Sequence, residues 1–269
     1  TETAPIRFSR TPGTTTSWGG IVINGSTSGP SPLTEIRNAH IEFNGSTAIH
    51  SQSGGEVELE AVTFGNTAVQ YLSLDASSFR VYNCVFPSAA AGANFELVHG
   101  SAGIKTGGRA IFVRNFFGVA NSVSGDYNDV MDFTGGQRPG PILQIIDNVF
   151  IGSGDDLDGT DAWIEGNIFM HVHKNGSPDS ASAISGGNDG ALVSHVTITG
   201  NLFYDMDHAA TAKQGNYYTF TNNTVVRQTI SGGNDTEGGV FNLADEGTTY
   251  GAGFYAEGNI LTDCQKRVR

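Results

Sequence analysis

The sequence predicts an all-β protein: one single-stranded right-handed parallel β-helix, a solenoid of at least nine coils that occupies residues 1–269 as a single domain. Three observations predict this fold. A short apolar strand pattern that usually ends at an Asn recurs along the chain. No window keeps the helical spacing of apolar residues over three turns. The distance between successive copies varies, which suits a β-helix better than a propeller or a helical repeat.

The composition favours strands and turns over helices. The 269 residues include 37 Gly and 16 Phe but only 14 Lys and Arg. Long helices need Ala, Leu, Glu, Lys and Arg in amphipathic register, whereas here short β-branched and aromatic runs lie between clusters of Gly, Asn, Asp and Ser. No Pro-rich, highly charged or low-complexity stretch divides the chain, so we expect one domain.

The repeated segment is an apolar alternation, then an Asn, then Phe or an aliphatic residue one or two positions later. The clear copies are 79–86, 110–117, 143–150, 162–169, 196–203, 218–225 and 254–261, and the weaker ones are 35–43 and 57–64. The marker positions are Asn38, Ala61 (in place of Asn), Asn83, Asn115, Asn148, Asn167, Asn201, Asn223 and Asn259. Their spacing ranges from 19 residues (148 to 167) to 36 (223 to 259), so turns of different length must separate the strands.

Parallel in-register stacking would place each residue type above itself on the next coil. An Asn inside a turn can then bond its side-chain amide to the next Asn along the axis, which predicts an Asn ladder. The same stacking predicts an aromatic core row of Phe86, Phe117, Phe150, Phe169 and Phe203.

The charge balance limits the classes of partner. The formal net charge is −13 and the pI about 4.7, so the protein should repel nucleic acids and, without a cation between them, acidic polysaccharides. The sequence contains no stretch of 18 apolar residues, so we expect no membrane-spanning helix. The two cysteines, Cys84 and Cys264, fit either buried free thiols or a disulfide. Thr1 lies in what looks like an ongoing coil, which suggests a mature form or a fragment of a longer protein.

A second, polar pattern precedes the markers. Aligning the strands upstream of each Asn predicts a column of His99, Asp132, Asp158, Ser185, Lys213 and Asn242. A partner column three residues earlier contains Glu96, Asp129, Asp155, Ser182, Ala210 and Gly239. A polar column on a parallel sheet belongs on the solvent face, where stacked coils are about 4.8 Å apart.

Carboxylates at such a short separation repel each other unless one is protonated or a cation lies between them. We therefore predict a Ca²⁺ site with ligands drawn from Asp129, Asp132, Asp155, Asp156, Asp158 and Asp161. The alternative is a solvated acidic turn that binds no ion. His99, His171, His173 and His208 are candidate substrate-binding residues of the same groove. His171 and His173 alternate and could share a metal, although no third ligand is evident.

The Asn-x-Phe coils and the Asp-rich run GDDLDGTDA, which precedes a strand, resemble the right-handed parallel β-helix polysaccharide lyases. Pectate lyases of family 9 and, more loosely, the chondroitinase B and alginate lyase group are the families in question. The resemblance implies a secreted or extracellular protein in which Asp132, Asp155, Asp156 and Asp158 hold Ca²⁺ against a uronate carboxylate. It also implies that Lys213 removes the proton next to that carboxylate, so that the glycosidic oxygen is eliminated.

Three functions remain open from the sequence. The first is a Ca²⁺-dependent lyase acting on an acidic polysaccharide, a uronic-acid polymer. The second is a non-catalytic β-helix module that binds carbohydrate or spaces other domains of a secreted or surface protein. The third is a β-helix glycoside hydrolase with Asp129 and Asp155, or Asp155 and Asp156, as acid and base. The fold cannot choose among them, and the sequence leaves the oligomeric state open.

Overall fold

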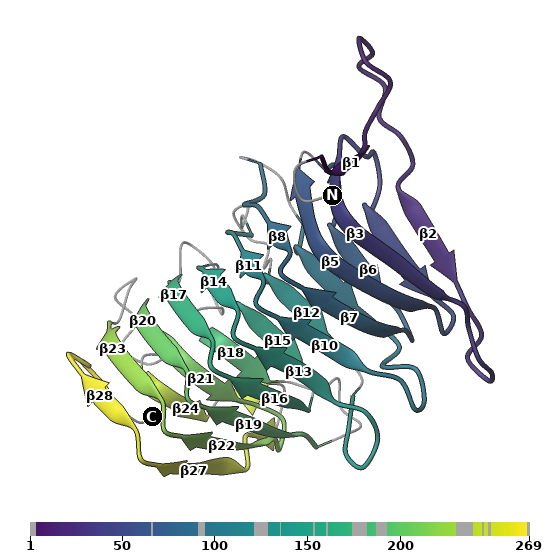
Figure 1. The fold of residues 1–269 in the computed structure, drawn as a ribbon. Coiled ribbons are helices and arrows are strands. Elements are labelled where there is room, and N and C mark those ends of the chain that lie inside the picture. The colour runs from purple at the N-terminus through teal and green to yellow at the C-terminus, as the bar shows by residue number, and fades with distance from the viewer. Residues whose placement is uncertain are drawn as a thin grey trace.

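The computed structural model describes residues 4–65, 67–90, 95–120, 129–134, 136–152, 154–159, 161–173, 182–186, 193–229, 239–243, 245–246 and 249–267. These residues form strands and turns and no helix, which confirms the all-β prediction. The strands join a 17-stranded and a nine-stranded sheet, and every pairing within both sheets is parallel (Figure 1). Only β25 (Asp245–Glu246) and β26 (Thr249–Tyr250) pair as an antiparallel ribbon among the described residues.

Each coil contributes one strand to the nine-stranded sheet and then either two strands or one longer strand to the larger sheet. The nine strands are β2 (Ile21–Asn24), β4 (Ile49–Gln52), β6 (Leu72–Leu74), β9 (Val98–Gly100), β12 (Met131–Phe133), β15 (Leu157–Gly159), β18 (Ser182–Gly186), β21 (His208–Ala212) and β24 (Gly239–Leu243). Because each pairs with its equivalent on the next coil, the chain advances by one strand spacing per coil.

The nine-stranded sheet is the first strand column of the molecule. The larger sheet contains two more, the second and third columns, which meet at a sharp turn. The second column holds β7 (Ser78–Tyr82), β10 (Ala110–Val113), β13 (Leu143–Ile146), β16 (Ala162–Glu165), β19 (His195–Thr199), β22 (Tyr217–Thr221) and β27 (Gly253–Glu257). The third holds β1 (Ile6–Phe8), β8 (Val85–Phe86), β11 (Phe116–Phe117), β14 (Val149–Ile151), β17 (Ile168–Val172), β20 (Leu202–Met206), β23 (Thr224–Gln228) and β28 (Ile260–Thr262). Two longer strands, β3 (Leu33–Glu42) and β5 (Glu56–Gly65), run through both columns.

The predicted Asn ladder lies at this turn and joins consecutive coils. The Asn148 backbone N–H and side-chain amide both donate to Asn167 Oδ1, at 2.8 and 3.0 Å. The Asn167 side-chain amide donates in turn to Asn201 Oδ1, at 2.9 Å. The ladder members are Asn115, Asn148, Asn167, Asn201, Asn223 and Asn259. The first five are almost fully buried, so each bond is made away from water.

The first three predicted markers lie one residue before the ladder position. Tyr82 pairs with Val113 and Val85 with Phe116, so Cys84, not Asn83, is aligned with Asn115. The same register puts Ala39 and Val62 in the ladder column. Asn38, Ala61 and Asn83 adopt the left-handed backbone conformation of the turn itself, with φ of 49°, 53° and 53°. Apolar side chains fill the column on these coils, and the ladder begins where the Cys84 N–H donates to Asn115 Oδ1.

The aromatic row is confirmed and is longer than predicted. Phe86, Phe117, Phe150, Phe169 and Phe203 stack with ring centroids 4.7–5.1 Å apart, and Phe64 adds a ring before Phe86. All are buried, and burying a Phe side chain contributes about 1.5–3 kcal/mol. Cys84 and Cys264 are both free thiols, and burial raises the pKa of Cys84 to about 12.

We predict that Asn167→Ala lowers the free energy of unfolding by about 2–5 kcal/mol, because it leaves the buried Asn148 N–H and the Ile145 carbonyl without their bonds. Urea denaturation measures the change. The matched control is Asn24→Ala, which removes an exposed Asn bonded only to Gln52 and should change stability by about 0.5 kcal/mol or less. Equal losses in the two variants would contradict a structural role for the ladder.

Candidate functional site

The outer face of the nine-stranded sheet carries a column of polar residues. In β12 and β15 the residues that flank the central Asp are buried, so Asp132 and Asp158 point away from the core. The register runs through His50, Ser73, His99, Asp132, Asp158, Ser185, Thr211 and Asn242. The predicted column is confirmed at five of its six positions, and the structure extends it upstream to Ser73 and His50.

Lys213 does not belong to this column, which corrects the predicted alignment. Thr211 pairs with Ser185 on one side and with Asn242 on the other. Lys213 follows the end of β21, where its N–H donates to Gly186 O and it bridges Tyr250 in antiparallel fashion. A single residue separates β20 from β21. The connection is shorter than on the other coils, so a prediction based on their spacing places the column residue too late in the chain. The catalytic role of Lys213 stays a prediction.

The partner column is also present, and its residues lie at or just before the first residue of each strand. Val130 N donates to Asp155 O and Asp156 N donates to Ser182 O, which aligns Asp129, Asp155 and Ser182. The next position belongs to His208 and not to the predicted Ala210, because Ser182 pairs with His208. Asp129, Asp155, Ser182 and His208 are all buried, at 3–8% exposure. The His208 ring lies 3.2 Å from Ser182 Oγ, so it belongs to a buried network.

The two columns bring five carboxylates together on three neighbouring coils. We call this group, with its one imidazole, the acidic cluster: Glu96, His99, Asp129, Asp132, Asp155 and Asp158. Glu96 Oε2 lies 2.7 Å from His99 Nδ1, and Asp132 Oδ2 lies 3.7 Å from the same nitrogen. One ligand atom of each of these three residues lies within 4.8 Å of the others, a spacing that could hold a metal ion.

Asp129 is the electrostatic centre of the acidic cluster. Burial raises its pKa well above the ordinary range, and the neighbouring carboxylates Asp155, Asp158, Asp132 and Glu96 raise it further. The hydrogen bond that His99 Nδ1 makes to the Glu96 carboxylate raises the pKa of His99, against the opposite effect of burial. At neutral pH the group therefore favours an added positive charge, which a proton or a metal cation can supply. Carboxylate oxygens are the ligands that Ca²⁺ prefers, so the residues fit that ion.

Two of the predicted metal ligands lie apart from the acidic cluster. The Asp156 side chain is fully buried, and neither of its oxygens has a hydrogen-bond partner among the described residues. Burial, and then Asp155, raises its pKa well above the usual value. Asp161 accepts hydrogen bonds from the Arg138 backbone N–H, at 3.0 Å, and from the Arg138 guanidinium.

His171 and His173 lie in the third column, on β17 and just after it. His171 Nδ1 is 2.8 Å from Asp205 Oδ2, and His173 Nδ1 is 3.1 Å from Asp207 Oδ1. The bond to Asp207 raises the pKa of His173. Both rings come near Asp205 Oδ2, at 2.8 Å for His171 and 3.5 Å for His173. Their polar contacts are thus with Asp205 and Asp207 and not with the acidic cluster, and their part in substrate binding stays a prediction.

A neighbouring polar group escaped sequence analysis. Asp75 accepts hydrogen bonds from Ser101 N, Ser101 Oγ, Ser73 Oγ and the His50 ring, at 2.7–3.1 Å. These bonds lower the pKa of Asp75 in spite of its partial burial. His50 occupies the same column as His99, but the weak Asn marker of its coil hid that relation.

Comparison with known proteins gives no assignment: no family model matches the chain, and neither does any curated protein or solved structure. The part of the chain that the structure describes contains no helix that could span a membrane.

We predict that Asp156→Leu raises the free energy of unfolding at pH 7, measured in a chelator, by about 1–3 kcal/mol. A carboxyl whose folded pKa is raised favours the folded state below its unfolded pKa, and that contribution is lost as pH rises towards the folded pKa. The variant should therefore show a flatter stability profile from pH 4 to 8. Asp147→Asn, at an exposed turn, is the control, and a lower stability of Asp156→Leu at pH 7 would contradict the prediction.

Proposed function

We propose that the acidic cluster binds a divalent cation, Ca²⁺, and through it the carboxylates of an acidic polysaccharide, which the protein cleaves by β-elimination. The observation that carries this proposal is the convergence of five carboxylates on three adjacent coils around the buried Asp129. Isolated turn carboxylates need no cation, but a group in which four neighbours each raise the pKa of the fifth gains most from one.

The residues take different parts in the proposed reaction. Asp129, Asp132, Asp155 and Asp158 hold the cation, and bound Ca²⁺ would withdraw charge from the uronate carboxylate and acidify the adjacent C–H. His99 keeps a proton at Nδ1 against Glu96 and orients that carboxylate. Lys213 accepts the proton from the sugar, which requires the substrate to extend two coils beyond Asp158, about 10 Å along the stack.

The finer features of the fold belong to the same proposal. We infer a right-handed β-helix, since parallel strands joined by crossovers in one sheet are right-handed in about 98% of cases. Resemblance to the polysaccharide lyases of family 9 and to the chondroitinase B and alginate lyase group rests on the Asn ladder and on the acidic run before β16. A secreted or extracellular location follows from that resemblance alone.

A glycoside hydrolase is the second candidate, and one observation favours it. Asp129 and Asp155 occupy equivalent positions on adjacent coils, about 4.8 Å apart, and the pKa of Asp129 is raised. Retaining glycosidases place an acid and a nucleophile about 5–5.5 Å apart, with the pKa of the acid raised in the same way. In that case Asp129 would protonate the leaving oxygen and Asp155 would attack.

Isothermal titration with CaCl₂ tests the cation. We expect saturable binding that tightens from pH 5 to 8, because the proton on Asp129 must leave, and a loss of at least about tenfold in affinity for Asp129→Asn. Asp263→Asn removes the same charge from an exposed turn and should bind as the wild type does. Equal affinities of wild type and Asp129→Asn would contradict the site.

An absorbance assay on pectate, alginate and chondroitin tests the reaction. We expect an unsaturated product in Ca²⁺, none in a chelator, and a loss of at least about 100-fold for Lys213→Ala. Full activity of that variant would overturn the base assignment. New reducing ends without an unsaturated product would favour the hydrolase, and Ca²⁺-dependent binding without any cleavage would favour a non-catalytic module.

A further inference from the structure

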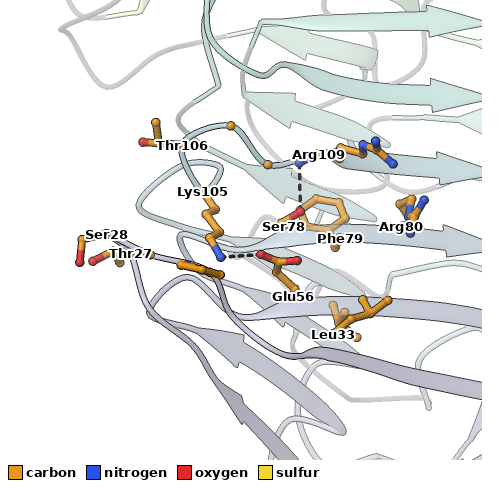
Figure 2. Close-up of a pocket in the computed structure, with 15 residues that line it drawn as sticks. Thr27, Ser28, Leu33, Glu56, Ser78, Phe79, Arg80, Lys105, Thr106 and Arg109 are labelled. Carbon is orange, nitrogen blue, oxygen red and sulfur yellow. Dashed lines mark hydrogen bonds and ion pairs between the residues drawn. The ribbon is translucent and has the colours of Figure 1, made fainter.

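A second concave site lies on the first coils, next to the turn between β9 and β10. Figure 2 shows this cavity of about 700 Å³, which we call the basic pocket. It is lined by the loop between β2 and β3, by the starts of β3, β5 and β7, and by the turn 105–109. None of its lining residues belongs to the acidic cluster, although His99 and the turn belong to the same coil.

The basic pocket reverses the charge of the chain. The sequence has 27 Asp and Glu against 14 Lys and Arg, yet the pocket is lined by Arg80, Lys105 and Arg109 with Glu56 as its one carboxylate. A concave surface with a positive balance on an acidic protein concentrates anions where the remaining surface repels them.

Lys105 fixes the shape of the pocket. Its side chain is only 8% exposed, and Nζ donates to Glu56 Oε1 at 2.6 Å and to Ser31 Oγ at 3.0 Å. The bond from Lys105 is the largest cause that lowers the pKa of Glu56. This pair neutralises itself and ties the turn 105–109 to β5, so it shapes the wall and leaves ligand binding to other groups.

Arg109 is the cation available to a ligand. Its backbone N–H donates to Ser78 Oγ at 3.1 Å, while its exposed guanidinium forms no ion pair with any described residue. Arg80, in contrast, is bound to Glu58 at 2.6 Å. In Figure 2 the Arg80 and Arg109 side chains extend to the same side of the pocket, away from Lys105 and Glu56.

The other lining groups define the class of ligand. Hydroxyls come from Thr27, Ser28, Ser78 and Thr106, and Leu33 presents an apolar side chain that is 46% exposed. Hydroxyl partners beside one apolar patch match the faces of a sugar ring, and a free guanidinium binds a carboxylate through two parallel hydrogen bonds. The volume falls in the range of about 300–1,000 Å³ that is usual for small-ligand sites.

We propose that the basic pocket binds a carboxylated saccharide, a short uronate segment, with Arg109 paired to one carboxylate. This binding needs no metal ion, so it is independent of the acidic cluster and of any reaction there. On a longer polymer it would hold one part of the chain on the coil that also carries His99.

Titration with trigalacturonate in a chelator tests the proposal, with methyl-esterified trigalacturonate as the neutral comparison. We expect saturable binding of the acid form, at least about tenfold weaker binding of the ester, and a similar loss for Arg109→Ala. Arg109→Lys should bind between the two, since it keeps the charge but not the paired hydrogen bonds.

Two matched variants make the outcome specific. Arg114→Ala removes the same charge from an exposed turn of the same coil and should leave affinity unchanged. Asp129→Asn should also leave it unchanged, which separates this site from the cation site. The proposal is overturned if no saturable binding occurs in the chelator, if the ester binds equally well, or if Arg109→Ala and Arg114→Ala lose affinity alike.

Discussion

In-register stacking of parallel coils is the constraint on which the rest of this molecule depends. Each strand pairs with the equivalent strand of the next coil, so a residue meets its counterpart at about 4.8 Å. A side chain is therefore favourable only if it packs against, or bonds to, a copy of itself or a compatible neighbour. Phe satisfies the condition by stacking, and Asn satisfies it because its amide carries both a donor and an acceptor.

The same constraint makes carboxylates costly, and their position is informative for that reason. Asp132 and Asp158 are direct neighbours in the register, and Asp129 and Asp155 are aligned three residues earlier. Like charges that face each other in a sheet destabilise it. An Asp that faces a Ser, as Asp155 faces Ser182 and Asp158 faces Ser185, has no such repulsion. A repeat that keeps like charges on two consecutive coils retains a local strain that a bound cation or a shared proton would relieve.

The sequence predicted most reliably the positions where one residue type repeats. The Asn–Phe pairs from Asn115 to Asn201 anchor the register, and the acidic columns follow from it. The prediction slipped by one residue at Asn83, because an Asn also suits the left-handed turn position that precedes the ladder. It slipped by two at Lys213, because the length of a turn cannot be read from the strands that flank it. The basic pocket combines residues from three coils and a turn that does not repeat, so no periodic pattern in the sequence predicts it.

The direction of the Asn ladder has an electrical consequence. Every Oδ1 in it accepts from the preceding coil, and each side-chain amide from Asn115 to Asn223 donates to the Asn of the following coil. The amide dipoles are therefore parallel along the stack, as peptide dipoles are in an α-helix. The row carries partial negative charge at its beginning, where Asn115 Oδ1 takes the Cys84 N–H, and partial positive charge at Asn259. The protein thus contains a row of parallel side-chain dipoles inside an all-β fold, and the two ends of this row attract opposite charges.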